Sequence, residues 1–441
     1  MINHTTRGVV SAKRRAFFAA AVLALAVAGC SGEADAVPDA TIGQSCLGAA
    51  DWVGTWSASP MPADASWGPP NTGFEDQTLR QIVHISVGGP QLRVRFSNEY
   101  GSTPLAIGAA HVALQSEAES IVPWSDRALT FSGAPTVVIA AGEVATSDPV
   151  ELNVAACSDL AVSIYVPEAT GPATIHDFGA QTTYISSPGN FTGSTTLPTS
   201  TTNLSRYWLS GVDVHAQPNA SAVVALGDSI TDGVGSTFDA NSRWPDLLSQ
   251  RLNSCSTSTA QPQGPRFGRA GVLNQGISGN RLLHDVVGPM GLSRFDRDVL
   301  EQPGASHVIV MLGINDIGFP GALGVPDQAV TADQITEGLT ELVDRAHAGG
   351  LYAYGATLAP FEGTFAPYYT AEGEITRQAV NDWIRSSGTF DAVIDFDQVL
   401  GDPAHPTRML PEYDSGDHLH PNDAGYQAMA NAIDLALIDS R

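Results

Sequence analysis

A serine hydroxyl lies at the corner of the segment VVALGDSITDG, residues 223–233, where an apolar run meets Gly-Asp-Ser. A neutral hydroxyl is a weak nucleophile, so it needs a nearby base, a group that orients the base, and donors for the oxyanion formed on attack. Farther along, the segment DHLHP supplies Asp417 and His420 three residues apart. The pattern therefore predicts Ser229 as nucleophile, His420 as general base and Asp417 as the carboxylate that sets the imidazole tautomer.

Two further segments offer donors for an oxyanion. Asn315 in MLGIND follows an apolar strand-like run and carries a neutral side-chain amide. Gly279 in NQGISGN has no side chain, so its backbone N–H can approach a substrate closely. These two groups are therefore candidate donors for the oxyanion.

Other polar residues near these motifs have structural interpretations. Asp228 is expected to brace the turn by accepting hydrogen bonds, and His418, two residues from His420, is expected to project elsewhere. His284 and His307 have no carboxylate or cysteine at metal-ligand spacing, and the chain has no Cys-x-x-Cys pair. The sequence therefore predicts neither a metal site nor a cofactor.

The elements around the motifs predict an α/β domain over residues 216–441. The apolar runs AVVAL, HVIVML, LYAYGATL and DAVIDF alternate there with amphipathic helical patterns. This alternation is typical of a parallel sheet covered on both faces, where reactive groups gather at the carboxyl ends of the strands. One helix is expected over residues 333–347, ended by Gly349 and Gly350, and another from Asp423.

Residues 51–215 follow a different pattern. Short alternating runs separated by Gly and Pro predict an antiparallel β-sandwich. In QIVHISVGGPQLRVRFS, residues 81–97, the alternation on both sides of Gly88 and Gly89 predicts a hairpin. A length of 441 residues suits two domains of this kind.

The first 30 residues resemble an export signal. Basic residues precede an uncharged apolar run, Ala16 to Ala28, which is too short to span a bilayer as a helix. The segment VAGC resembles a lipobox, in which Cys30 is lipidated and becomes the mature N-terminus; the alternative is ordinary cleavage nearby. Residues 31–50 are small, polar and acidic, as in a flexible linker. The predicted product is exported, either lipid-anchored at the cell envelope or secreted.

The charge and the cysteine content of the chain limit the possible binding partners and disulfide bridges. The chain carries 21 basic against 46 acidic residues, a net charge of −25, and no basic stripe with interleaved aromatics. Nucleic acid is therefore not an expected partner. In an oxidising compartment Cys46 and Cys157 are candidates for a bridge, which leaves Cys255 alone if Cys30 carries lipid, but the spacing leaves the pairing open.

The motifs GDSITDG, NQGISGN, GIND and DHLHP occur in the order of the four conserved blocks of GDSL esterases, also called SGNH hydrolases. The resemblance covers about Ser221 to Leu437 and departs at Ile230, where the family's name has leucine. The β-rich N-terminal part resembles the extension of some bacterial secreted members. The resemblance implies a three-layer flavodoxin-like fold, with Ser229, His420 and Asp417 as the triad and Ser229, Gly279 and Asn315 as the oxyanion hole.

We therefore expect an exported serine ester hydrolase that works through an acyl-enzyme on small acyl esters, of either carbohydrate or lipid and lysophospholipid type. Aromatic side chains in residues 359–373 are candidates for stacking on sugar rings. One alternative is an envelope carbohydrate-binding protein, with Trp52, Trp56, Trp67 and Trp124 as a sugar platform. A second alternative is a transacylase, in which a sugar hydroxyl replaces water. Acyl length, alcohol and oligomeric state are not determined by the sequence.

Overall fold

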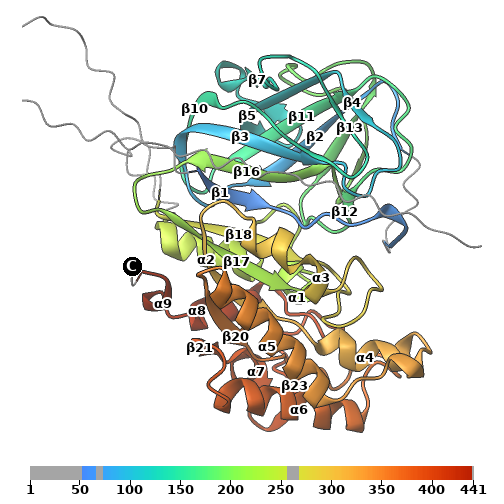
Figure 1. The fold of residues 1–441 in the computed structure, drawn as a ribbon, viewed down its shortest axis with the longest axis vertical. Coiled ribbons are helices and arrows are strands. Elements are labelled where there is room, and N and C mark those ends of the chain that lie inside the picture. The colour runs from blue at the N-terminus through green and yellow to red at the C-terminus, as the bar shows by residue number, and fades with distance from the viewer. Residues whose placement is uncertain (1–51, 66–72, 256–267, 440–441) are drawn as a thin grey trace, which may run out of the picture. The chain divides into compact units, whose positions relative to one another are not determined.

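The computed structural model describes residues 52–65, 73–255 and 268–439. The predicted leader, the linker, Cys30, Cys46 and Trp67 lie outside these residues. The described residues comprise a β-rich region up to residue 215 and an α/β region from residue 221 (Figure 1). Among them, no helix combines the length and the apolar character that crossing a bilayer requires.

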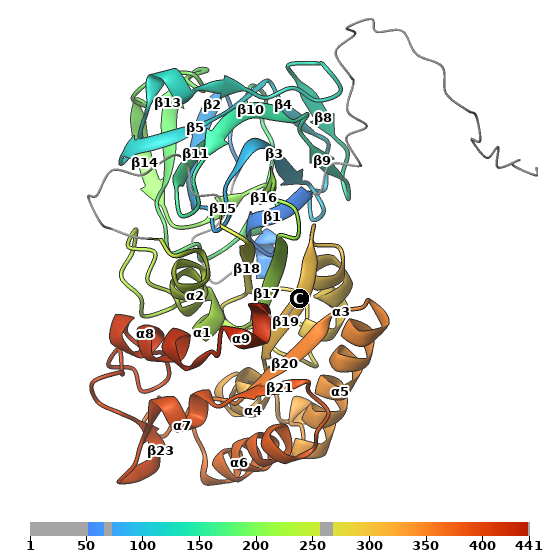
Figure 2. The ribbon, with the colours of Figure 1, turned by 90° about the vertical axis from the view of Figure 1, so that its left-hand side faces the viewer.

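Two antiparallel sheets make up most of the β-rich region (Figure 2). The first contains, in order, β1 (Trp52–Ser57), β16 (Leu209–His215), β3 (Gly89–Ser97) and β10 (Val150–Val154), with β9 (Val144–Thr146) also paired to β3. The second contains β14 (Thr199–Asn203), β13 (Thr183–Pro188), β2 (Gln77–His84), β11 (Asp159–Val166), β5 (Ala109–Glu117) and β6 (Ser120–Ile121), with β7 (Arg127–Ala128) paired to β5. Both sheets contribute apolar side chains to one core. Two short pairs complete the region: β12 (Ile175–His176) with β15 (Arg206–Tyr207), and β4 (Leu105–Ile107) with β8 (Val137–Ile139).

The predicted hairpin over residues 81–97 is wrong. Strand β2 pairs with β11 and β13, whereas β3 pairs with β16, β10 and β9, so the chain crosses from one sheet to the other at residues 85–88. A Cβ on Gly88 would lie 2.3 Å from the carbonyl oxygen of Val154, so the crossing passes close to other backbone. Alternating apolar residues around Gly-Gly fit a sheet crossing as well as a hairpin, because each strand buries one face in the same core.

The α/β region contains a five-stranded parallel sheet. Its order is β18 (Ala270–Gly276), β17 (Ser221–Gly227), β19 (Ala305–Met311), β20 (Tyr352–Ala356) and β21 (Ala392–Ile394), and every pair is parallel. Alternate residues of β17 and β19 enter two different apolar clusters, one on each face of the sheet. The helices and the remaining short strands are α1 (Ser229–Asp232), α2 (Trp244–Asn253), α3 (Gly291–Phe295), α4 (Ile314–Ala322), α5 (Ala332–Ala348), α6 (Ala371–Ser386), α7 (Phe396–Leu400), α8 (Asp423–Ala432), α9 (Ala436–Asp439), β22 (Gly401–Asp402) and β23 (His405–Met409).

Helices cover both faces of this sheet (Figure 2). Helix α5 packs Leu339 and Leu342 into the cluster on one face, and helices α2 and α8 pack Trp244 and Met429 into the cluster on the other. The predicted helix at 333–347 is confirmed as α5, because its apolar residues recur at the helical period and Thr331 caps its first turn. The predicted helix from Asp423 is confirmed as α8, which ends at Ala432.

The β-rich and α/β regions pack together, and the described residues form one compact unit. The predicted boundary near residue 215 falls between β16 and β17. Strand β1 lies against β18, where Gly54 and Gly271 allow close approach: a Cβ on Gly271 would lie 2.1 Å from the carbonyl oxygen of Gly54. Cys157 of the β-rich region is disulfide-bonded to Cys255 of the α/β region, with Cα atoms 6.1 Å apart.

This disulfide overturns the bridge between Cys46 and Cys157 that the sequence offered as a candidate. Cys157 has only one sulfur, and it is bonded to Cys255. The two residues are 98 positions apart, and only the packing of the two regions brings them together. The covalent bridge therefore ties the β-rich region to the α/β region.

Candidate active site

Ser229 lies at the carboxyl end of the central strand β17. Strand β17 ends at Gly227, and the side chain of Asp228 accepts a hydrogen bond from the N–H of Ile230 at 3.1 Å, which caps helix α1. A Cβ on Gly227 would lie 2.0 Å from the hydroxyl of Thr231, so the turn into the helix requires glycine there. Ser229 is the first residue of α1 and is 7% exposed. The turn presents its hydroxyl at the edge of the sheet where parallel strands end.

His420 and Asp417 come from the loop before α8, and His420 contacts this serine. The Nε2 atom of His420 lies 2.8 Å from Oγ of Ser229, and its Nδ1 atom lies 2.6 Å from Oδ2 of Asp417. The other oxygen of Asp417 accepts hydrogen bonds from the backbone N–H groups of Leu419 and His420. Because Nδ1–H of the neutral ring donates to the carboxylate, the lone pair of Nε2 faces the serine.

The environment of Asp417 favours its charged form. Burial opposes the charge, but the side chain of His420 and two backbone N–H groups hold the pKa of Asp417 well below its usual value. An ionised carboxylate here stabilises an imidazolium on His420. The structure places His420 between Ser229 and Asp417, in contact with both.

His418 forms a separate pair beside this group. Its Nδ1 atom lies 2.5 Å from Oδ2 of Asp414, and its side chain is 53% exposed. Its backbone has a φ of 65°, in the left-handed region, which turns the side chain away from the direction of its neighbours. The structure thus agrees with the prediction that His418 projects elsewhere than His420.

Gly279 and Asn315 lie on neighbouring loops at the same end of the sheet. Gly279 follows β18 and has a φ of 80°, a conformation that favours glycine. Asn315 lies in the first turn of α4, after β19, and is 3% exposed. Its Nδ2 atom donates to the carbonyl oxygen of Asn280 at 2.8 Å, which ties the two loops together.

Tyr368 orients this asparagine. The phenol hydroxyl donates to Oδ1 of Asn315 at 2.8 Å, and Tyr368 is 2% exposed. Burial and nearby carboxylates raise the pKa of Tyr368 well above its usual value, so the hydroxyl stays protonated and remains a donor. The amide of Asn315 is therefore held at both ends, and one hydrogen of Nδ2 remains for another acceptor.

One known protein family matches the segment of the chain that carries these site residues. Residues 225–428 match the sequence profile of the GDSL-like Lipase/Acylhydrolase family. These residues belong to that family. A domain of this family makes the chain a carboxylic ester hydrolase. A comparison with curated proteins found no match.

Several solved structures resemble the GDSL-like domain. A lipolytic protein of the G-D-S-L family from Desulfitobacterium hafniense is 24% identical; the match covers 48% of this chain and 97% of that one, with a TM-score of 0.34. A GDSL-like lipase from Bacteroides thetaiotaomicron is 19% identical over 50% and 89% of the two chains, with a TM-score of 0.37. An aryl esterase from M. smegmatis is 19% identical over 48% and 96%, also with a TM-score of 0.37. These scores are low, so the family assignment rests on the sequence match.

Two buried carboxyl groups brace the loops of the GDSL-like domain. Burial raises the pKa of Asp228 to about 7, and one of its oxygens has no hydrogen-bond partner among the described residues. Burial also raises the pKa of Asp316 to about 6, although this carboxyl accepts the backbone N–H groups of Leu282 and Leu283. Asp228 accepts a backbone hydrogen bond in the turn, as its interpretation as a bracing residue predicts.

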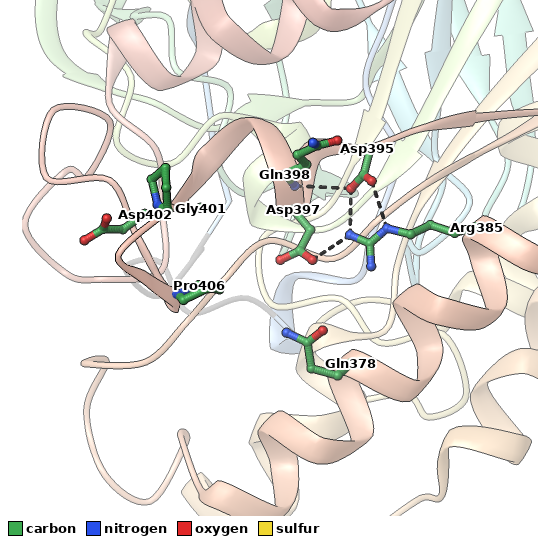
Figure 3. Close-up of a pocket in the computed structure, with 9 residues that line it drawn as sticks. Gln378, Arg385, Asp395, Asp397, Gln398, Gly401, Asp402 and Pro406 are labelled. Atoms are coloured by element: carbon green, nitrogen blue, oxygen red, sulfur yellow. Dashed lines mark hydrogen bonds and ion pairs between the residues drawn. The ribbon is translucent and has the colours of Figure 1, made fainter.

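The GDSL-like domain also has a large open cavity that is lined by residues other than the predicted site residues. It has a volume of about 600 Å³ and is lined by parts of α6, α7 and the β22–β23 hairpin (Figure 3). Its guanidinium group, on Arg385, donates to Asp395 at 2.8 Å and to Asp397 at 2.7 Å, so two carboxylates already neutralise it. None of the lining residues is one of the predicted site residues. Among the described residues, no group of three or more His, Cys, Asp or Glu side chains is arranged to hold a metal ion.

The aromatic side chains that the sequence offers for sugar stacking are partly buried. In the loop over residues 359–373, Phe361 and Tyr368 are at most 2% exposed, so their rings are not free to contact a sugar, whereas Phe365 is 61% exposed. Of the proposed tryptophan platform, Trp56 is 6% exposed and lies in the core, while Trp124 is 69% exposed. Phe361, Tyr368 and Trp56 therefore serve packing, as aromatic residues in a domain core commonly do.

Proposed function

We propose that the GDSL-like domain hydrolyses small acyl esters through an acyl-enzyme on Ser229. The observation that carries this proposal is the continuous chain from Oγ of Ser229 to Nε2 of His420 at 2.8 Å and from Nδ1 of His420 to Asp417 at 2.6 Å. Such a chain activates a hydroxyl that is otherwise a weak nucleophile. The parallel strand order and the helical cover of both sheet faces support the flavodoxin-like three-layer arrangement that the family resemblance implies.

In the first half-reaction, Oγ of Ser229 attacks the ester carbonyl while its proton passes to Nε2 of His420. The tetrahedral oxyanion accepts hydrogen bonds from the N–H groups of Ser229 and Gly279 and from the remaining hydrogen on Nδ2 of Asn315. The carbon–oxygen bond to the alcohol then breaks, and the alcohol leaves with the proton held by His420. Asp417 stabilises the imidazolium during this step.

In the second half-reaction, water replaces the alcohol. His420 removes one proton from the water, and the resulting oxygen attacks the acyl carbon. The bond between the acyl group and Ser229 breaks, and Oγ takes the proton back from His420. The acid is released, and the enzyme returns to its starting protonation state. No cofactor enters this sequence of steps.

The burial of the nucleophile supports a small acyl group. Ser229 is 7% exposed, and Ile230, Thr231 and Asp232, which follow it, are at most 2% exposed. A side chain as buried as that of Ser229 leaves little room around Oγ for a bulky acyl group, because protein interiors are close-packed. We therefore propose acetyl and other short acyl esters, on either carbohydrate or lipid alcohols, as substrates.

Two observations support export. The basic and apolar leader resembles a signal segment, with Cys30 as a candidate for lipidation. The disulfide between Cys157 and Cys255 is typical of an oxidising compartment. Mass spectrometry of the mature N-terminus distinguishes a lipid-anchored protein from a secreted one.

The experiment for the proposed function replaces Ser229 by alanine and measures hydrolysis of p-nitrophenyl acetate. We expect kcat to fall by at least about 10³-fold, because the covalent pathway is lost. The matched control is Ser249→Ala, which removes a buried hydroxyl from helix α2 and should leave kcat unchanged. Parent activity in Ser229→Ala would contradict the proposal. A panel of esters from two to twelve carbons then tests the preference for short acyl groups.

A further inference from the structure

His176 connects the β-rich region to the helix that carries Ser229. It lies on strand β12 and is 5% exposed. Its Nδ1 atom lies 3.1 Å from the carbonyl oxygen of Ser59, and its Nε2 atom lies 3.0 Å from Oδ1 of Asp232 and 2.9 Å from the carbonyl oxygen of Phe178. All three partners are acceptors, and a neutral imidazole has only one N–H. The ring is therefore a doubly protonated imidazolium that donates on both sides.

The electrostatics agree with this protonation state. Burial opposes a charge on the ring and Arg206 repels it, yet the carboxylate of Asp232 and the carbonyl of Ser59 raise the pKa of His176 above its usual value. Asp232 is itself 1% exposed, so the two opposite charges are buried as a pair. Removal of either partner leaves an uncompensated buried charge.

Asp232 also contacts the loop that contains Gly279. Its second oxygen, Oδ2, accepts the backbone N–H of Ser278 at 2.9 Å and the hydroxyl of Ser278 at 2.6 Å. Gly276 packs directly on the same helix turn, since a Cβ there would lie 2.3 Å from the backbone nitrogen of Asp232. The position of Ser278, and hence of the N–H of the next residue, depends on where the carboxylate of Asp232 is held.

A second contact from the β-rich region converges on the same loop. The hydroxyl of Ser59 donates a hydrogen bond to the carboxylate of Asp298 at 2.5 Å. The guanidinium of Arg294 donates to the same carboxylate at 2.8 Å. Arg294 is 2% exposed, and its guanidinium contacts residues that precede or follow the site residues Ser229 and Gly279. The same guanidinium also donates to the carbonyl oxygens of Gly227 and Gln275 and to Oδ1 of Asn280, at 2.7–3.0 Å.

From these contacts we propose that the β-rich region is a working part of the catalytic centre, in which His176 is a positioning residue for the N–H of Gly279. It acts through Asp232 and Ser278 and does not itself touch the substrate. This inference rests on the proposed function, because it assigns a support to the oxyanion hole of that reaction. A region that were only a tether or a binding module would not need a buried ion pair with the nucleophile's own helix.

The experiment replaces His176 by glutamine in the full chain and measures p-nitrophenyl acetate hydrolysis per titrated active site. We expect kcat to fall by about 10²-fold, the cost of a small misplacement of a transition-state donor, with KM nearly unchanged. Phenylboronic acid forms a tetrahedral adduct on a catalytic serine, so its inhibition constant should rise in parallel. A merely structural effect would lower the number of active sites but would leave the inhibition constant of the remaining sites unchanged.

The matched control is His111→Gln. His111 pairs with Asp126 at 2.9 Å in the same β-rich region, but this pair belongs to β5 and the turn beside it. Parent values of kcat and of the inhibition constant are expected for this variant. Parent values in His176→Gln would overturn the proposal.

A second variant keeps the proposal testable if His176→Gln does not fold. Ser278→Ala removes only the hydroxyl that Asp232 accepts, and we expect about a tenfold loss of kcat. Where both variants fold, the double variant should lose less than the product of the two single losses, because both act through Asp232. Parent kcat in Ser278→Ala, or fully multiplicative losses, would overturn the proposal.

Failure of this inference is distinguishable from failure of the proposed function. If Ser229→Ala retains ester hydrolysis, the proposed function is wrong whatever His176→Gln does. If Ser229→Ala abolishes both hydrolysis and boronate binding while His176→Gln behaves as the parent, only the positioning role is wrong.

Discussion

Replacement of Tyr368 by phenylalanine tests how the asparagine donor is held. The hydroxyl of Tyr368 donates to Oδ1 of Asn315 at 2.8 Å, and both side chains are at most 3% exposed. Phenylalanine preserves the ring and its packing but leaves the amide oxygen without this partner. A buried acceptor that loses its partner costs about 1–3 kcal/mol, and we expect the free energy of unfolding to fall by an amount in this range.

The effect on catalysis should be smaller than loss of the donor itself. The second bond of the amide, from Nδ2 of Asn315 to the carbonyl oxygen of Asn280, stays in place. A flip of the amide would put two oxygens against each other, so the donor loosens without turning away. Loss of about 1.4 kcal/mol of transition-state stabilisation lowers kcat about tenfold, whereas Asn315→Ala should lower it about 10²- to 10³-fold.

The assay is a double-mutant cycle on p-nitrophenyl acetate hydrolysis, with kcat and KM measured separately. KM should change little, because the contact strengthens in the transition state. In the Asn315→Ala background, Tyr368→Phe should have almost no further effect on kcat, since its target is gone. Tyr369→Phe, the same change at the neighbouring and more exposed residue, is the control. A tenfold loss that persists in the Asn315→Ala background would refute the reasoning.

Two further predictions concern stability. In the folded state the pKa of Asp228 is about 7, against an ordinary value of 3.8. Between these two pH values the folded state keeps a proton that the unfolded state releases. The free energy of unfolding therefore falls as pH rises from about 4 to about 7. The side chain of Asp228→Asn cannot titrate. In urea unfolding, its free energy of unfolding should rise by up to about 4 kcal/mol relative to that of the parent across this pH range. Parallel curves of unfolding free energy against pH would contradict this prediction. Replacement of Cys157 and Cys255 by serine should lower the unfolding free energy by about 2–5 kcal/mol with kcat per active site unchanged, and equal denaturation midpoints would contradict it.

The central part of the fold could be predicted because its signals are local. The apolar period of helix α5 and the strand-like runs of β17 and β19 are properties of neighbouring residues, and both elements appear where expected. Ser229, His420 and Asn315 could be proposed together because each follows or precedes such an element, and parallel strands present their carboxyl ends at one edge.

Other features depend on contacts between distant segments. The chain crosses between sheets after β2, a route that the Gly-Gly signal does not distinguish from a hairpin. Tyr368 is one of several aromatic residues in one segment of the sequence. Only the folded structure shows that Tyr368 is buried and bonded to Asn315, whereas Phe365 is exposed. His176 is an isolated histidine on a two-residue strand, 56 positions before Asp232, and no local pattern marks it.

The place of strand β18 in the sheet favours the proposal that the β-rich region supports the loop of Gly279. Strand β18 is at the end of the sheet order, so only one of its sides is paired with another strand of that sheet. Backbone groups on such an edge need other partners and are more easily displaced. Here the backbone N–H of Val272 donates a hydrogen bond to the hydroxyl of Ser86 at 2.9 Å. The side-chain Nε2 of Gln275 donates to the hydroxyl of Ser57 at 3.0 Å.

Both partners come from the β-rich region, which therefore closes the edge from which Gly279 extends. An oxyanion donor is effective only if it does not have to reorganise as charge develops. The strand before Gly279 is fixed by Ser57 and Ser86, and the loop itself is fixed by His176 through Asp232. Loosening of the edge should therefore lower kcat before it lowers the amount of folded protein, and this order of effects separates a catalytic support from a structural appendage.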